Sequence, residues 1–189
     1  VRRAASSIVT AVVTCERTLQ LWPELIPFLV QLLDSGNPDA VDGALQALTK
    51  LCEDSPSKMD DPHAGRPLTL LVPKLIQFLS SQHESERYAA LGCLHQFLSP
   101  MPDALTQNIV PFVQGVFSLA NDQSMRVLRR VCAAFVVLLQ VRPEVIAASV
   151  DSINQYMLAA TCSDDENVAL EACEYWLAMS EVPQLCHES

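Results

Sequence analysis

The seven cysteines are the residues of this sequence most able to do chemistry, but their spacing does not assemble a site. None belongs to a Cys-x-x-Cys pair, and the nearest neighbours, Cys162 and Cys173, are 11 positions apart. A metal site needs clustered ligands, so we expect none. Most of the cysteines lie in apolar helical runs, where we expect reduced, buried thiols of an intracellular protein. These are Cys52, Cys93, Cys132 and Cys173.

Histidine, serine and carboxylate side chains give no catalytic arrangement either. His95 and Cys93 are two positions apart on one predicted helix, so their side chains do not face each other and form no nucleophile–base pair. No Ser-His-Asp set, glycine-rich phosphate loop or pair of carboxylates with a supporting pocket can be picked out. We therefore predict that the chain is not an enzyme and binds no cofactor.

The charge and the apolar runs narrow the range of partners. A formal net charge of −10 argues against nucleic acid or an anionic membrane as the main partner, because both attract basic surfaces. It suits a basic protein partner, and it is also ordinary for a soluble acidic protein. The longest apolar run, Val131–Leu139, is far shorter than the roughly 18 residues of a membrane span. We recognise no signal peptide, and the start at Val1 without Met leads us to expect a piece of a longer protein.

Helices must position any binding residues. Half of the residues are hydrophobic, only 6% are aromatic and glycine is scarce, which favours helices packed on helices. The stretch 164–179 shows the pattern, with a first turn of Asp164, Asp165 and Glu166 that opposes the helix dipole. Its apolar residues recur at spacings of four, four and three on one predicted face: Val168, Ala172, Trp176 and Met179. One such helix cannot bury its stripe alone.

The chain supplies partner helices by repeating itself. A small or apolar residue recurs in the second helix of each predicted pair, at separations of 39, 46, 41 and 41: Ala5, Ala44, Ala90, Val131 and Ala172. The helices that precede three of these share an apolar-apolar-proline step ending at Pro27, Pro73 and Pro111. A period near 40 built from two antiparallel helices, with proline in the first, is the signature of HEAT and armadillo repeats.

We therefore predict an all-α fold, a HEAT-repeat α-solenoid in which antiparallel helix pairs stack into a superhelix. Residues 1–14 would be the orphan second helix of an incomplete repeat, and 54–66 an exposed loop. About four full repeats are expected, over approximately 22–54, 67–99, 103–140 and 143–181. We expect unbroken helices from Asp103 to about Ala120 and from Pro143 to about Ala160. The second helices would line the concave inner face.

The exposed face of each second helix provides the candidate partner-binding residues. They are Asp42, Gln46, Lys50, Glu53, Tyr88, His95, Arg129, Glu174 and Glu181, with the helix start Asp164, Asp165 and Glu166 added as a turn that could reach a basic partner. Each could equally be an ordinary solvated residue, and the acidic turn could be only a helix start. Charged contacts at a rim mainly tune association rate and salt dependence.

Several segments resemble one family, the transportins (karyopherin-β2) of the importin-β superfamily of nuclear import receptors. They are DENVALEACEYWLAMSE (165–181), WPELIPFLVQLLDS (22–35), GALQALTKLCEDS (43–55), RPLTLLVPKLIQF (66–78) and VLLQVRPE (137–144). Generic HEAT repeats share the apolar pattern but not strings such as Glu171-Ala172-Cys173-Glu174. The composition of 54–66 and the basic run Arg126–Arg130 depart from the family.

The resemblance implies a receptor that shuttles between cytoplasm and nucleus through the nuclear pore. In this family, cargo with a proline-tyrosine-type signal binds the C-terminal arch, and the small GTPase Ran in its GTP form binds the N-terminal arch and releases the cargo. This chain resembles early repeats, so the resemblance implies part of the Ran-binding face and a cargo site elsewhere in the parent chain. Phe-Gly repeats of nucleoporins could meet Phe28 and Phe112. The alternative function is a HEAT-repeat scaffold such as a regulatory subunit of a protein phosphatase.

Overall fold

The structure is a computed structural model that describes residues 22–181. The predicted orphan helix at 1–14 lies outside these residues. The described part contains helices, turns and bends, and no strand. It divides into two compact units, the first ending at Asn108 and the second starting at Ile109.

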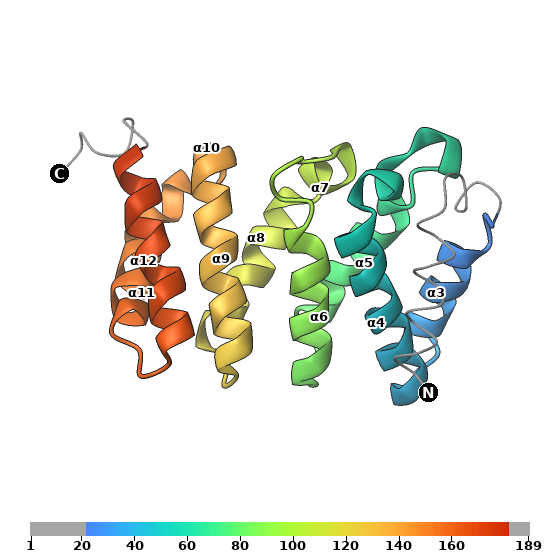
Figure 1. Ribbon diagram of the computed structural model, residues 1–189, viewed down its shortest axis with the longest axis horizontal. Helices are drawn as coiled ribbons and strands as arrows, with labels where there is room; N and C mark the ends of the chain where they lie inside the picture. The colour runs from blue at the N-terminus through green and yellow to red at the C-terminus, as the bar shows by residue number, and fades with distance from the viewer. Residues whose placement is uncertain (1–21, 182–189) are drawn as a thin grey trace. The chain divides into compact units, whose positions relative to one another are not determined.

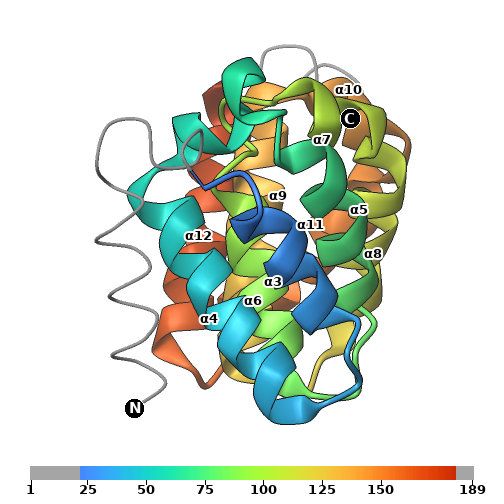
Figure 2. The same ribbon diagram turned by 90° about the vertical axis from the view of Figure 1, so that its right-hand side faces the viewer.

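The first unit consists of two helix pairs and the segments that follow them (Figure 1). Its elements are α3 (Leu25–Leu33), α4 (Pro38–Asp54), η1 (Pro56–Asp60), η2 (Pro62–Ala64), α5 (Leu68–Phe78), α6 (Glu84–His95) and α7 (Asp103–Gln107). Helix α3 packs against α4 and α5 packs against α6, while the second helices α4 and α6 lie side by side. Seen from its α3 end, this unit shows α3 and α4 as neighbours (Figure 2).

Local sequence sets where these helices begin. Asn37 caps α4, because its Oδ1 accepts hydrogen bonds from the backbone N–H groups of Asp39 (3.0 Å) and Ala40 (3.4 Å). Pro38 occupies the first position of α4, where a backbone N–H has no helical partner. Pro27 lies in the first turn of α3 for the same reason, so it does not kink that helix.

The segment 54–66 is more ordered than the exposed loop we expected. It contains the two short 3₁₀ helices η1 and η2, while most of its residues are exposed or half-buried. The Met59 side chain within η1 is fully buried and Ser55 is 8% exposed. An apolar anchor in the middle of a polar stretch orders the segment against the first unit, because burying one methionine side chain contributes about 2 kcal/mol.

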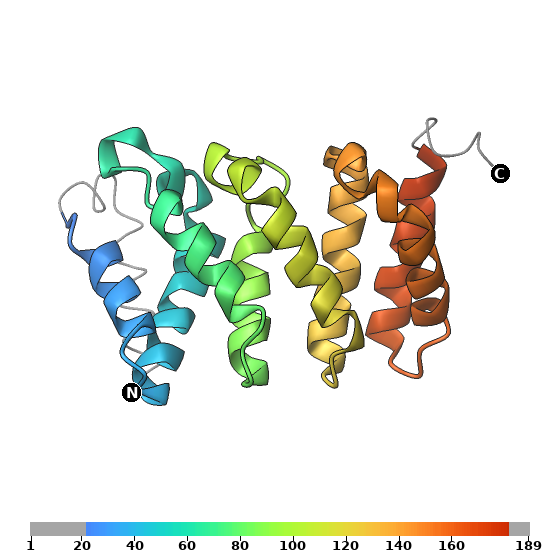
Figure 3. The same cartoon turned by 180° about the vertical axis from the view of Figure 1, so that it is seen from behind.

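The second unit repeats the two-layer arrangement. Its elements are α8 (Ile109–Ser118), η3 (Leu119–Asn121), α9 (Met125–Val141), α10 (Pro143–Ile146), η4 (Ala147–Ser149), α11 (Val150–Thr161) and α12 (Glu166–Glu181). Helix α12 packs most extensively against α9 and also against α11. Seen from behind, α3 and α5 lie in front of α4 and α6 in the first unit, and α11 lies in front of α12 in the second (Figure 3).

Two helices that we expected to be continuous are interrupted. The stretch from Asp103 to about Ala120 breaks at Asn108, between α7 and α8. Pro111 has no N–H for the carbonyl of Gln107 and its ring would clash there, so the break places Pro111 in the first turn of a new helix. The Asn108 side chain stabilises the end of α7 by donating from Nδ2 to the carbonyl oxygen of Ala104 (2.8 Å). The stretch 143–160 is divided into α10, η4 and α11.

The buried face of α12 is centred differently from our prediction. Val168 and Ala172 are buried as expected, but the next large buried side chain is Tyr175, and Trp176 and Met179 are only half-buried. Because α12 packs against both α9 and α11, its buried arc is wider than one stripe. Trp176 lies at the α11 edge of this arc, where its Nε1 donates to Oγ1 of Thr161 (3.2 Å).

The described cysteines divide into two groups. Cys52, Cys93 and Cys132 are buried, but Cys162 and Cys173 are exposed, so the prediction that Cys173 is buried was wrong. Cys173 is two positions from Tyr175 and therefore lies on the opposite side of α12. The pattern of small and apolar residues along the helix did not show that this side is exposed. Burial raises the pKa of the Cys132 thiol to about 11, which keeps it protonated and poorly nucleophilic.

Candidate partner-binding surfaces on the second helices

The first candidate surface lies on α4 and α6 of the first unit. We call it the first-unit surface, and it comprises Asp42, Gln46, Lys50, Glu53, Tyr88 and His95. The four α4 residues follow one another by three or four positions and therefore share one face. Their side chains are paired with one another: Gln46 Nε2 donates to Asp42 Oδ2 (2.7 Å), and Lys50 Nζ lies 3.1 Å from Glu53 Oε2.

The charged groups of this surface that face solvent are Lys50 and Glu53, which form an exposed ion pair. The hydrogen bond to Glu53, followed by the charges of Glu53 and Asp54, raises the pKa of Lys50. Lys50 therefore stays protonated over the whole physiological range. Because exposed ion pairs contribute little to stability, both side chains can turn to a partner at small cost.

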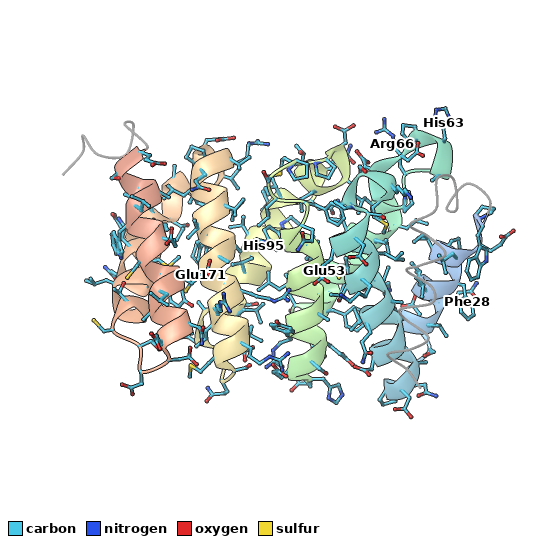
Figure 4. All side chains as sticks on the ribbon, viewed as in Figure 1. Phe28, Glu53, His63, Arg66, His95 and Glu171 are labelled. Carbon is cyan, nitrogen blue, oxygen red and sulfur yellow. The ribbon has the colours of Figure 1, made fainter. Side chains whose placement is uncertain are left out.

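Helix α6 contributes less accessible residues to the same surface. Tyr88 and His95 are two helical turns apart and so lie on one face of α6, but both are half-buried. Figure 4 labels Glu53 and His95 on the second helices of this unit. A partner would therefore reach Lys50 and Glu53, which are exposed, more easily than Tyr88 or His95.

The second candidate surface lies on α9 and α12 of the second unit. We call it the second-unit surface, and it comprises Arg129, Glu171, Glu174 and Glu181. Arg129 Nε on α9 lies 3.3 Å from Glu171 Oε2 on α12 (Figure 4 labels Glu171). Glu171 was missing from the sequence-based set. The sequence did contain a signal for this pair. Glu171 lies 42 residues after Arg129, which is about one repeat, and this spacing places the two opposite charges on neighbouring second helices.

The acidic start of α12 serves chiefly as a helix cap. Asp165 Oδ1 accepts from the backbone N–H groups of Asn167 (3.0 Å) and Val168 (3.1 Å), and the Asp165 N–H donates to Ser163 Oγ (3.2 Å). Asp164 and Glu166 are exposed beside it. Helix α12 carries four glutamates and no lysine or arginine, so its accessible side is acidic.

Two kinds of site are not found in the part of the chain that the structure describes. Among the described residues, no group of three or more His, Cys, Asp or Glu side chains is placed to hold a metal ion. Within 22–181, none of the helices is long and apolar enough to cross a membrane. The polar side chains of both surfaces are instead spread along helix faces, as expected for contacts with a macromolecule.

The fold places the chain in a class of repeat proteins. A family model described as "Stalled ribosome sensor GCN1-like, HEAT repeats" matches residues 28–180, and the chain belongs to this family of HEAT-repeat proteins. An engineered protein of known crystal structure matches with a TM-score of 0.75 and 16% identity, over 96% of this chain and 75% of that one. A designed armadillo repeat protein in complex with the peptide (KR)4 matches with a TM-score of 0.71 and 16% identity, over 94% and 74%. The predicted all-α HEAT solenoid is confirmed.

Curated relatives make the relationship more specific. The chain is 40% identical over 187 residues to importin subunit beta-2 of Schizosaccharomyces pombe, which is 98% of this chain and 20% of that protein. It is 40% identical over 181 residues to transportin-1 of Mus musculus, at 96% and 20% coverage. The chain is therefore homologous to transportins along nearly its whole length and spans about one fifth of the length of these relatives. The resemblance to transportins is confirmed, and homology to these transport proteins supports the prediction that the chain is not an enzyme.

Proposed function

We propose that the chain is a segment of a nuclear import receptor of the transportin type that binds Ran in its GTP form through its second-helix surfaces. The observation that carries the proposal is 40% identity to transportin-1 over 96% of the chain. Cargo with a proline-tyrosine-type signal would bind parts of the parent chain outside this segment. The parent would shuttle between cytoplasm and nucleus. This similarity favours the receptor over the phosphatase-type scaffold, which would share only the repeat pattern.

The mechanism we propose is binding linkage. Cargo and Ran-GTP each lower the affinity of the receptor for the other, and this coupling is reciprocal. The contact residues would be the first-unit surface, the second-unit surface and the start of α12 at Asp164, Asp165 and Glu166. Exposed carboxylates such as Glu53 and Glu174 would attract a basic region of Ran and raise its association rate. We retain the division into repeats over 22–54, 67–99, 103–140 and 143–181 as part of this proposal.

Replacing Asp42, Glu53 and Glu174 together with alanine in the full-length parent is expected to weaken binding of Ran-GTP about tenfold. Three charged contacts of roughly 0.5 kcal/mol each give this change. The measurement is calorimetric titration with Ran loaded with GTP or with GDP.

The matched control replaces three exposed carboxylates outside the two surfaces with alanine, at Glu24, Asp39 and Asp151. This variant removes the same total charge from residues outside the proposed contact. It should therefore leave the affinity for Ran-GTP nearly unchanged. Equal weakening by both triple variants would move the Ran contacts away from the second helices. Binding of neither nucleotide state by the wild-type parent would contradict the receptor proposal and favour the scaffold.

We also propose that phenylalanine side chains of nucleoporin Phe-Gly repeats contact the first helices of the first unit. Phe28 on α3 is 52% exposed, whereas Phe112 is fully buried in α8 and is excluded as a contact. A small cavity of about 200 Å³ lies between the start of α3 and the start of α5, lined in part by Trp22, Ile26 and Leu70. The Trp22 side chain is 40% exposed.

Changing Phe28 to serine in the full-length parent is expected to weaken binding to a Phe-Gly repeat peptide about threefold. The effect is small because several weak sites act together in multivalent binding. Surface plasmon resonance against an immobilised repeat would measure it. Val110→Ser is the control, since Val110 is also exposed, on α8. An unchanged affinity of the Phe28 variant would remove Phe28 from the contact.

A further inference from the structure

A groove on the first unit is separate from both second-helix surfaces. Its volume is about 610 Å³, and it lies between the 3₁₀ segment η1–η2 and the turn that follows α6. Its lining residues are Pro56, Ser57, Asp60, Asp61, Pro62, Gln96, Phe97, Pro100 and Pro102. Phe97 is buried, and most of the other lining residues are exposed. Pockets that hold drug-sized ligands span roughly 300–1,000 Å³, so the groove is large enough for a few residues of a peptide.

The walls of the groove are held in place before anything binds. Pro56 and Pro62 each occupy the first position of a 3₁₀ helix and fix its backbone φ angle. The buried Met59 side chain anchors the segment between them. Arg66 Nη1 also lies 3.1 Å from Asp103 Oδ2 at the start of α7, but both side chains are exposed, so this ion pair adds little to the prolines and Met59 (Figure 4 labels Arg66). A preformed site loses less conformational entropy on binding.

The lining combines apolar rings with carboxylates. Four proline rings and Phe97 provide the apolar part, and Asp60 and Asp61 provide negative charge. Asp61 Oδ1 already accepts a hydrogen bond from the His63 N–H (2.9 Å), so Asp60 is the carboxylate better placed to meet a ligand. The stretches 53–66 and 96–103, which surround the groove, contain five Asp or Glu residues and two Lys or Arg residues. This local excess of negative charge favours a cationic ligand.

We propose that the groove binds a short extended peptide of a partner protein in which an aromatic residue adjoins arginine or lysine. The aromatic ring packs on the proline rings above Phe97, where a flat apolar side chain buries the most area. The neighbouring cation pairs with Asp60 at the rim, and the planar guanidinium of arginine makes this pairing most directional. The proposal does not depend on Ran or on the receptor function.

The probe is a fluorescein-labelled peptide, acetyl-Gly-Tyr-Arg-Arg-Gly-amide, and its binding to the whole 189-residue chain is followed by fluorescence anisotropy. The same peptide with both arginines replaced by glutamate is the comparison. We expect the arginine peptide to bind at least tenfold more tightly than the glutamate peptide. Asp60→Asn should weaken arginine-peptide binding about threefold to tenfold, and Ser57→Trp should block the groove and abolish binding.

Two control variants keep the test specific. Asp39→Asn removes one charge near the start of α4, at the end of that helix far from the groove, and Ser85→Trp adds the same bulk in the first turn of α6. Neither should change the affinity more than twofold. Equal binding of the two peptides would overturn the proposal. So would equal weakening by Asp39→Asn and Asp60→Asn, since this would show general attraction to an acidic chain. If Ser57→Trp fails to fold, the comparison of the two Asp→Asn variants decides.

Discussion

Replacing Phe135 with alanine is expected to lower the free energy of unfolding of the second unit by about 3–5 kcal/mol. Phe135 is fully buried in α9. Its ring centroid lies 5.2 Å from that of Phe117 and 6.1 Å from that of Tyr156, so one substitution removes both aromatic contacts and leaves a cavity. Folded proteins are stable by only about 5–15 kcal/mol, so the variant loses a large fraction of this stability.

Urea unfolding followed by tryptophan fluorescence provides the measurement. The chain has two tryptophans, Trp22 in the first unit and Trp176 in the second, and a Trp22→Phe background lets Trp176 report on the second unit. Phe28→Ala is the matched control, because Phe28 is 52% exposed and its truncation should cost less than about 1 kcal/mol. A loss below 1 kcal/mol for Phe135→Ala would contradict the packing we describe.

The second unit is expected to lose about 2 kcal/mol of stability as the pH rises from about 10 to about 12. Burial raises the pKa of Tyr175 to about 12. The unfolded chain releases this proton near pH 10, whereas the folded chain keeps it until about pH 12. Below pH 10 both states are protonated and Tyr175 adds no pH dependence. Between the two pKa values the unfolded state binds fewer protons, so stability falls with rising pH. Burial also raises the pKa of Tyr156, which acts in the same direction.

Comparison with Tyr175→Phe isolates this contribution. The variant cannot ionise at this position. The loss of stability between pH 10 and 12 should therefore be about 2 kcal/mol smaller in the variant than in the wild type. At neutral pH it should be about 1 kcal/mol less stable, because the hydrogen bond from the Tyr175 hydroxyl to Asn154 Oδ1 (2.8 Å) is lost. Urea titrations at several pH values from 8 to 12 would measure both effects. Identical pH profiles for the two proteins would show that Tyr175 is not the group responsible.

Local sequence determined much of this protein. The apolar positions of α4 recur with the helical period, and Val41, Ala44, Leu45, Leu48 and Leu51 are all buried. Asn37 caps α4 because its side chain reaches N–H groups only two and three residues away. The period near 40 and the prolines of three first helices, Pro27, Pro73 and Pro111, identified the repeat class without any tertiary information. These features depend on residues within one helix or one repeat, which is why the sequence alone sufficed.

The tertiary structure decided the features in which residues of different repeats or of neighbouring helices meet. Helical periodicity treats Phe28 and Phe112 alike, yet one is exposed and the other buried, because packing covers each helix differently. The same packing centred the buried arc of α12 on Tyr175 and left Trp176 at its edge. The ion pair between Arg129 and Glu171 joins α9 to α12. The proline-lined groove likewise combines residues 56–62 with residues 96–102. These contacts arise from the packing of helices against one another. The local sequence of one segment does not show which distant segment it will contact.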